Sequence, residues 1–133
     1  MRRVRALLAV LSLFAAACST TGGLPRQPFA DIPAPPTWRP STQNWAMIST
    51  PKITAARLVY ASDEGMESTL ASARQGMLGG GWSQQGTERF VSAQGFDGVW
   101  ADFAKGEDIC RVTVTEARYG SQVDVTTARV PAR

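Results

Sequence analysis

Histidine is absent from the 133-residue sequence, and its absence limits the chemistry that the chain can perform. Histidine is the usual general base of serine and cysteine hydrolases and the commonest metal ligand in proteins. Cys110 therefore lacks an imidazole partner for thiol-protease chemistry, and one thiol among scattered carboxylates makes a poor zinc site. We expect neither a metal nor another cofactor.

Carboxylate pairs are the remaining groups that could catalyse a reaction. Glycoside hydrolysis needs two carboxyl groups that face each other across a sugar-sized cleft. The predicted positions of the close pairs are a helix start, a hairpin and a turn, where carboxylates are normally solvated. We therefore expect no enzyme, and a weak carboxylate-dependent glycan hydrolase that uses Asp97 and Asp102 stays as an alternative. The close pairs are Asp63 with Glu64, Asp97 with Asp102, and Glu107 with Asp108.

Tryptophan and arginine side chains are the other groups that could bind a ligand. Indole rings can stack on glycans or anchor a protein interface. Arginines on a solvent-facing sheet surface could form a basic strip. The structural alternatives are core packing for the tryptophans and a solvated surface for the arginines. The residues that we expect to contact a ligand or partner are Trp38, Trp45, Trp100, Arg57 and Arg111.

The first 18 residues have the pattern of an export signal. Three arginines within the first five residues precede an apolar run over residues 6–14, and three alanines over residues 15–17 suit a signal peptidase. The apolar run is shorter than the roughly 20 residues of a membrane-spanning helix. The cysteine directly after the alanines resembles the lipobox of bacterial lipoproteins. This resemblance implies that Cys18 becomes the acylated first residue of the mature chain.

The domain organisation follows from this signal. Residues 1–17 are predicted to be the signal peptide, and residues 18–37 the lipidated cysteine with a proline-rich tether. Five prolines between residues 25 and 36 favour an extended tether. Residues 38–133 are predicted to form one small domain, because about 100 residues suffice for one domain and not for two.

The net charge and the cysteines bear on partners and on redox chemistry. The formal charge of +3 comes from the signal, because residues 18–133 contain eleven basic and eleven acidic side chains. This balance gives no reason to expect nucleic-acid binding. Acylation of Cys18 would leave Cys110 without a disulfide partner in the chain. Cys110 is interpreted as a small buried residue of a strand, with a reactive thiol as the alternative.

The periodicity of the apolar residues predicts one helix and several strands. Met66, Leu70, Ala73 and Met77 draw one apolar stripe along a helix that the glycines at positions 79–81 end. Alternation predicts strands over residues 52–61, 82–91, 99–105, 109–117 and 122–129, and residues 45–48 could add a short one. The predicted class is α+β: two layers, with one amphipathic helix on an antiparallel sheet of about four to five strands in the order β-α-β-β-β.

The domain resembles small bacterial envelope lipoproteins of uncharacterised function. The resemblance covers about residues 31–129, and it implies a fold and a location but no activity and no catalytic residue. The parts that carry it are a proline-bearing approach (31–36), a strand (56–60), a helix end that closes on Met and then Gly-Trp (77–82), and a penultimate strand that opens with cysteine (110–114).

These observations together predict a non-catalytic binding or structural module that a lipid anchor holds on a membrane of the cell envelope. A module that binds peptidoglycan or lipid is the first alternative. The expected partners are the membrane itself and an envelope protein or peptidoglycan. Ser19 is not the aspartate that marks inner-membrane retention in some bacteria, so the periplasmic face of the outer membrane is the preferred address over the inner membrane.

Overall fold

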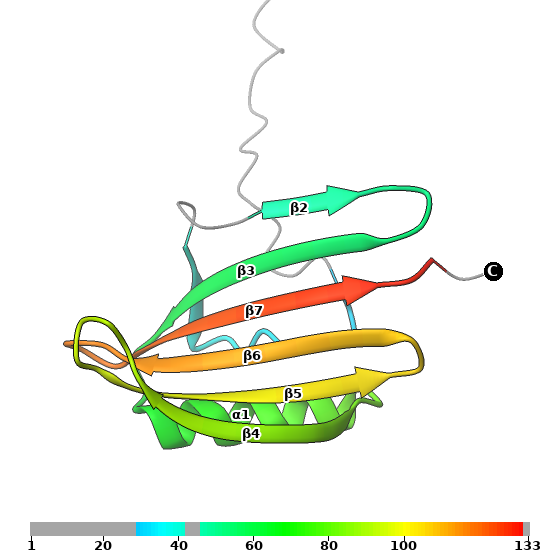
Figure 1. The fold of residues 1–133 in the computed structure, drawn as a ribbon. Coiled ribbons are helices and arrows are strands. Elements are labelled where there is room, and N and C mark those ends of the chain that lie inside the picture. Colours follow the sequence, from blue (N-terminus) through cyan, green and yellow to red (C-terminus); the bar gives the residue numbers. More distant parts are fainter. Residues whose placement is uncertain (1–28, 42–45, 132–133) are drawn as a thin grey trace, which may run out of the picture.

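The computed structural model describes residues 29–41 and 46–131 of the chain. These residues form one antiparallel sheet of seven strands and one helix (Figure 1). The helix, α1 (Met66–Gly79), lies between β3 and β4 in the chain. The strands are β1 (Trp38–Pro40), β2 (Ala46–Ser49), β3 (Thr54–Ser62), β4 (Ser83–Val91), β5 (Asp97–Lys105), β6 (Asp108–Glu116) and β7 (Ser121–Arg129).

The predicted fold class is wrong: the protein is mostly sheet, with 53% of its described residues in seven strands, and not a two-layer α+β domain of four to five strands. The two short strands account for the additional members. Both pair with β3, β2 along its first half and β1 along its last three residues. A short strand over residues 45–48 was expected only as a possibility, and it corresponds to β2, whereas β1 has three residues, too few for alternation to reveal it. Pro40 is tolerated in β1 because β1 lies at a sheet edge.

The connection through α1 joins β3 to β4, at opposite sides of the sheet. The strand order is β1-β3-β7-β6-β5-β4, so β3 and β4 are four strands apart although only α1 separates them in the chain. In Figure 1, α1 lies below β5 and behind β4, and it packs against β4, β5, β6 and β7. All five long strands are antiparallel to their neighbours.

The core lies between α1 and one face of the sheet. The apolar stripe that the sequence predicts, from Met66 to Met77, is the buried side of α1. Pairing aligns the opposing residues in rows across the sheet, because directly paired residues of an antiparallel ladder point to the same face. One such row contains Leu58, Val125, Val112 and Ala101, all of which are buried.

Residues 29–37 pack onto the domain, although they lie within the tether that is predicted from the sequence. Ile32 is part of the core cluster. Pro33 lies directly on Gly76, where an added Cβ would be 2.4 Å from the Pro33 Cβ atom. The Asp31 carbonyl oxygen lies equally close to Gly80, where an added Cβ would be 2.3 Å from it. The packed structure therefore includes this N-terminal segment (residues 29–37). Cys18 and the rest of the predicted tether lie outside the described residues.

We find no membrane-spanning helix among the described residues. None of their helices combines the length and the apolar composition that crossing a bilayer requires.

Candidate ligand-binding face of the sheet

All strands of the described residues belong to one sheet, and α1 is their one helix, so no second layer of helix or strand lies on the sheet face opposite α1. We call it the open face. Alternate residues of a strand point to opposite faces, so the strands that bury Leu58 and Val112 toward α1 direct Arg57 and Arg111 to the open face. Trp100 lies on the same face, because it pairs with Thr113, two residues along β6 from Arg111.

An apolar row crosses the open face at one end of the strands. The pairing register aligns five residues from β2, β3, β7, β6 and β5. Neighbouring strands are about 4.8 Å apart, so four steps give a row of about 19 Å. Three of its members are alanines, and two of these, Ala55 and Ala128, keep the surface low between the two isoleucines. The apolar row consists of Ile48, Ala55, Ala128, Ile109 and Ala104.

A groove with a volume of about 590 Å³ lies over this row. Its volume falls within the range of small-molecule sites, roughly 300–1,000 Å³. Four members of the apolar row line it: Ala55, Ala104, Ile109 and Ala128. Asp102, Arg111 and Thr126 contribute its polar side. The groove thus has the apolar row along its length, a polar flank beside that row, and Gln85 of β4 as a further polar lining residue.

The polar flank is the next row of the sheet, in which Asp102, Arg111, Thr126 and Arg57 are aligned. Arg111 donates two hydrogen bonds to Asp102, from Nε to Oδ1 at 2.7 Å and from Nη2 to Oδ2 at 2.8 Å. Its guanidinium carbon also lies 4.0 Å from the ring centroid of Trp100. A side chain that is held by a bidentate ion pair and a ring has few rotamers left. Arg111 is therefore fixed in place before any ligand arrives.

Arg57 has an equivalent partner in Asp124. Its Nε donates to Asp124 Oδ2 at 2.8 Å, and its Nη2 forms an ion pair with the same oxygen. In both pairs the arginine is the more exposed member: Arg57 and Asp124 are 50% and 19% exposed, and Arg111 and Asp102 are 48% and 36% exposed. The carboxylates lie deeper in the surface, and the positive groups are the ones presented to solvent.

Electrostatics keep Asp102 ionised. The hydrogen bonds from Arg111 and its positive charge lower the pKa of Asp102 below its ordinary value, and they outweigh the effect of partial burial, which raises it. A carboxylate held in this state accepts hydrogen bonds and is a weak general acid.

The carboxylates do not form a catalytic pair within the described residues. Asp97 and Asp102 are five positions apart on β5, so they point to opposite faces of the sheet. Asp63 is bound to Arg39, and Asp108 is bound to Arg129. Across residues 29–41 and 46–131, no group of three or more acidic or cysteine side chains could hold a metal ion.

The structure brings together three of the five residues that we expected to contact a ligand. Arg57, Arg111 and Trp100 share the open face, as described above. The expectation that Trp38 contacts a ligand is corrected by its burial. Trp38 is 1% exposed and packs against Tyr60 with 5.6 Å between ring centroids, so its ring does not reach the surface. It is buried because β1 adds to the edge of β3. Trp45 lies outside the described residues.

Cys110 is a free cysteine on the α1 side of β6. It is buried in the core, and this burial raises the pKa of its thiol to about 12. Because the thiolate is the nucleophilic form, a thiol with this pKa is unreactive at neutral pH.

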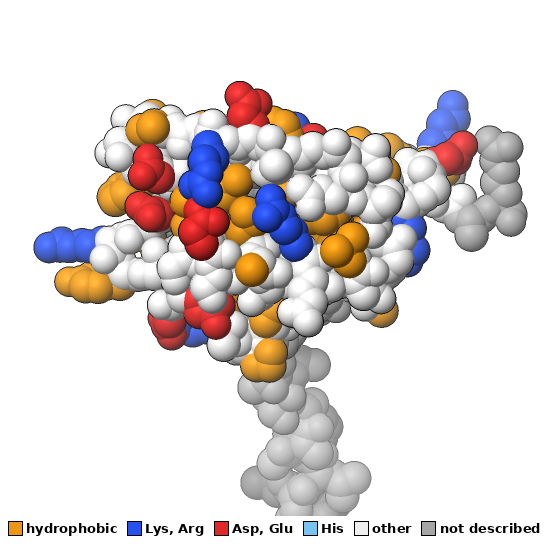
Figure 2. Space-filling view, turned by 90° about the horizontal axis from the view of Figure 1, so that it is seen from below, with side chains coloured by type: hydrophobic (Ala, Val, Ile, Leu, Met, Phe, Trp, Pro, Cys, Tyr) orange, Lys and Arg blue, Asp and Glu red, His pale blue; other side chains and the backbone are white. Residues whose placement is uncertain are grey.

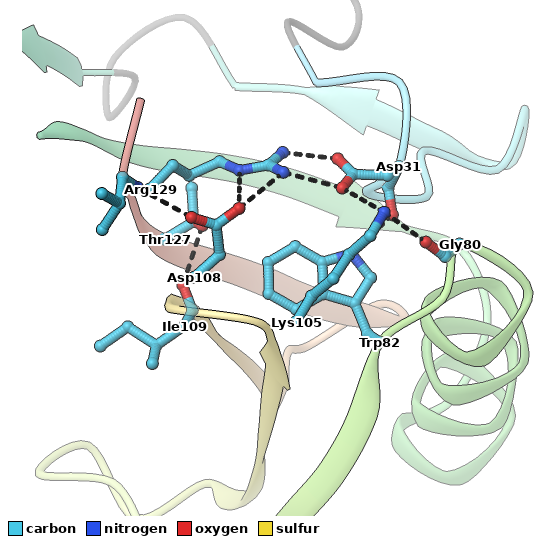
Figure 3. A network of polar contacts seen from close by, with 9 residues as sticks. Asp31, Gly80, Trp82, Lys105, Asp108, Ile109, Thr127 and Arg129 are labelled. Atoms are coloured by element: carbon cyan, nitrogen blue, oxygen red, sulfur yellow. Dashed lines mark hydrogen bonds and ion pairs between the residues drawn. The ribbon is translucent and has the colours of Figure 1, made fainter. Parts of the chain in front are cut away.

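A network of four charged residues closes the α1 side of the same strand end (Figure 3). Asp31 accepts hydrogen bonds from Arg129 and, at 2.9 Å, from Lys105. Arg129 also donates to Asp108 from Nε at 3.0 Å and from Nη2 at 2.9 Å. Lys105 donates to the carbonyl oxygen of Gly80 at 2.8 Å. The network joins the N-terminal segment to the ends of α1, β5 and β7.

The charges of this network balance, and its members satisfy one another. Burial raises the pKa of Asp31. The hydrogen bonds and charges of Arg129 and Lys105 together outweigh this effect, so the pKa of Asp31 lies below its ordinary value. Trp82 supports the network from beneath, because its Nε1 donates to the Asp31 carbonyl oxygen at 2.9 Å and its ring lies 5.4 Å from the Arg129 guanidinium. The network has the features of a structural lock. Sequence reasoning missed it, since its members are as far as 98 residues apart.

Charged side chains of both signs are intermixed on the surface formed by α1 and β4 (Figure 2). Glu67 of α1 forms an ion pair with Arg89 of β4. A nucleic-acid surface requires an extended basic region. This part of the surface has no extended region of one sign.

Comparison of the chain with family models, with curated proteins and with solved structures finds no match. The proposals below therefore depend on the residues of this chain.

Proposed function

We propose that the protein is a lipid-anchored, non-catalytic binding module of the bacterial cell envelope, and that it binds its partner on the open face. The observation that supports binding on the open face is the 590 Å³ groove over the apolar row. A sheet face that no other element covers within the described residues normally needs a polar surface, and a row of apolar residues there marks an interaction site.

The anchor in this proposal rests on the sequence. Cys18 follows an apolar run and three alanines, and the prolines beyond it suit a spacer between the bilayer and the domain. The periplasmic face of the outer membrane remains the preferred location.

The arrangement of the charged groups favours binding over catalysis. Asp102, which lines the groove, and Asp124, one row farther along the open face, are each bound to an arginine. A general acid needs a carboxyl group that holds a proton near neutral pH. The lowered pKa of Asp102 is the opposite of that requirement.

Stacking of a glycan on Trp100 has less support than contact with an apolar or amphiphilic partner. The Arg111 guanidinium lies 4.0 Å from the centroid of the Trp100 ring, so one side of the ring is already covered. The apolar row in the groove consists of alanine and isoleucine side chains, which offer no hydrogen bonds to sugar hydroxyls, and the groups that could do so lie beside it.

Site-specific photocross-linking in cells that express the full chain tests this proposal. A photoreactive phenylalanine analogue at Ile109, on the open face, is expected to form a discrete adduct with a partner. The same analogue at Gln75, an exposed position on α1, is the control and is expected to form none. Adducts of equal yield from both positions, or none from Ile109, would contradict a binding role for the open face.

The anchor has a separate test. The full chain is expected to take up labelled palmitate and to fractionate with membranes, whereas Cys18→Ser loses the label. A wild-type chain that incorporates no palmitate would remove the anchor from the proposal.

A further inference from the structure

The geometry of the open face points to a specific ligand class: we propose that the groove binds an acyl chain of an anionic lipid, with the lipid headgroup on Arg111 and Arg57. This inference rests on the proposed function and names the ligand of the same face.

The apolar row supplies the site for the acyl chain. Ile48 and Ile109 are both more than half exposed, and the alanines between them form a low, smooth floor. Ile53 and Val130, directly before β3 and close after β7, are also exposed at this end of the sheet. A row of about 19 Å without hydrogen-bonding side chains suits a flexible hydrocarbon chain.

The polar flank supplies the site for a negatively charged headgroup. Arg111 and Arg57 stand on either side of Thr126 in one row, next to the apolar row. The hydrogen bonds of each arginine to its aspartate use Nε and Nη2, two of the three nitrogens of the guanidinium. The guanidinium group has five N–H donors and matches phosphate and carboxylate oxygens in a bidentate geometry. The recessed aspartates hold both arginines in position for such an anion.

The point at which the tether joins the domain favours a lipid as the occupant. Asp31 binds Arg129 and Lys105, which directly follow Ala128 and Ala104 of the apolar row. The N-terminal segment is therefore fixed at the end of the sheet that carries the groove. Eleven residue steps separate Cys18 from Phe29, which at roughly 3.6 Å each limits their distance to about 40 Å. An acylated Cys18 would keep the groove within reach of the bilayer surface, where lipids are the most abundant ligands.

Cross-linking to a photoactivatable lipid tests this inference with the full chain, purified from membranes and reconstituted in vesicles. The vesicles contain phosphatidylglycerol with a diazirine on one acyl chain. A parallel set contains phosphatidylcholine with the same diazirine chain. After irradiation, the cross-linked peptides are quantified by mass spectrometry. Adducts are expected on the peptides that contain Ala104 to Arg111 and Thr126 to Val130, with at least a fivefold higher yield for phosphatidylglycerol.

Two matched pairs of variants separate groove binding from mere proximity to the bilayer. Ile109→Asp is expected to lower the adduct yield at least fivefold, whereas Leu78→Asp, an equally drastic change at an exposed position on α1, leaves it unchanged. Arg111→Ala is expected to remove the preference for phosphatidylglycerol, whereas Arg39→Ala, in the exposed pair with Asp63, retains it. Circular dichroism confirms that each variant is folded.

The outcomes distinguish this inference from the proposed function. Equal lipid adducts in wild type and Ile109→Asp, or adducts spread evenly over α1 and the sheet, would overturn the lipid assignment. If a protein adduct still forms at Ile109 in cells in that case, the open face binds a protein and only the lipid assignment fails. If neither lipid nor cellular adducts form, both proposals fail.

Discussion

Asp31 and Arg129 are separated by 98 residues and joined by two hydrogen bonds, from Nη1 to Oδ1 at 2.5 Å and from Nη2 to Oδ2 at 2.8 Å. Each side chain is only about one-fifth exposed. This pair connects the N-terminal segment, which contains Asp31, to β7, the last strand of the sheet. The N-terminal segment is therefore held directly on the end of β7 (Figure 3).

The first prediction concerns this lock. Asp31→Asn removes one of the two negative charges that Arg129 and Lys105 face, and it is expected to lower the free energy of unfolding by about 2 kcal/mol. Urea denaturation monitored by tryptophan fluorescence measures the change. Asp63→Asn is the matched control, because its ion pair with Arg39 is largely exposed, and it is expected to have no measurable effect. Equal losses in both variants would show that the network does not stabilise the fold.

The second prediction concerns acid. The pKa values of Asp31 and Asp102 are lower in the folded protein than the ordinary value of 3.8. Below about pH 4 the unfolded chain therefore binds more protons than the folded chain, and the stability that these carboxylates contribute is lost as the pH falls through their folded pKa values. We expect the urea midpoint to be constant from pH 7 to about pH 5 and to fall below pH 4. The fall is expected to be shallower in Asp31→Asn, and an equally steep fall would contradict the assignment to Asp31.

The third prediction concerns Gly76. Replacing glycine by alanine inside a helix normally stabilises it by up to about 1 kcal/mol. At Gly76 the new methyl group would lie 2.4 Å from the Pro33 Cβ atom, so the N-terminal segment must move. Gly76→Ala is expected to destabilise the protein by about 1–3 kcal/mol, the usual cost of overpacking. Thermal unfolding measures the change. Gly79→Ala, where no atom lies within 4 Å of the added Cβ, is the control and is expected to be neutral or slightly stabilising.

The long elements of this fold could be predicted from the sequence because their apolar periodicity extends over enough residues. The stripe from Met66 to Met77 predicted α1, and alternation predicted the strands that became β3 to β7. β1 has only three residues and was not predicted, and β2 was expected only as a possible strand over residues 45–48, so the predicted number of strands and the class were wrong. Alternation also indicated that Arg57 and Arg111 would face solvent.

The alignment of the groove could not be predicted in the same way. Which residues face each other depends on the register of each strand pair, and a shift of one residue reverses every side chain of a strand. Turns and packing fix the register, so the sequence did not indicate that Ala104, Ile109 and Ala128 form one row. Gly80 is a similar case. The sequence explains it as part of the helix end, whereas in the structure the close approach of the Asp31 carbonyl also requires a glycine.

The fourth prediction concerns the reactivity of Cys110, which lies on the buried side of β6 with a pKa raised to about 12. At pH 8 only about 1 in 10,000 such thiols is ionised, compared with roughly a tenth to a quarter of ordinary cysteines. A maleimide reagent is therefore expected to modify native Cys110 at least 100-fold more slowly than Cys110 in urea-unfolded chains. Ser68→Cys, at an exposed position on α1, supplies the control for an accessible thiol and is expected to react within minutes. Rapid labelling of Cys110 in the native protein would mean that β6 is open to solvent and that the core around Val112 is not packed as described.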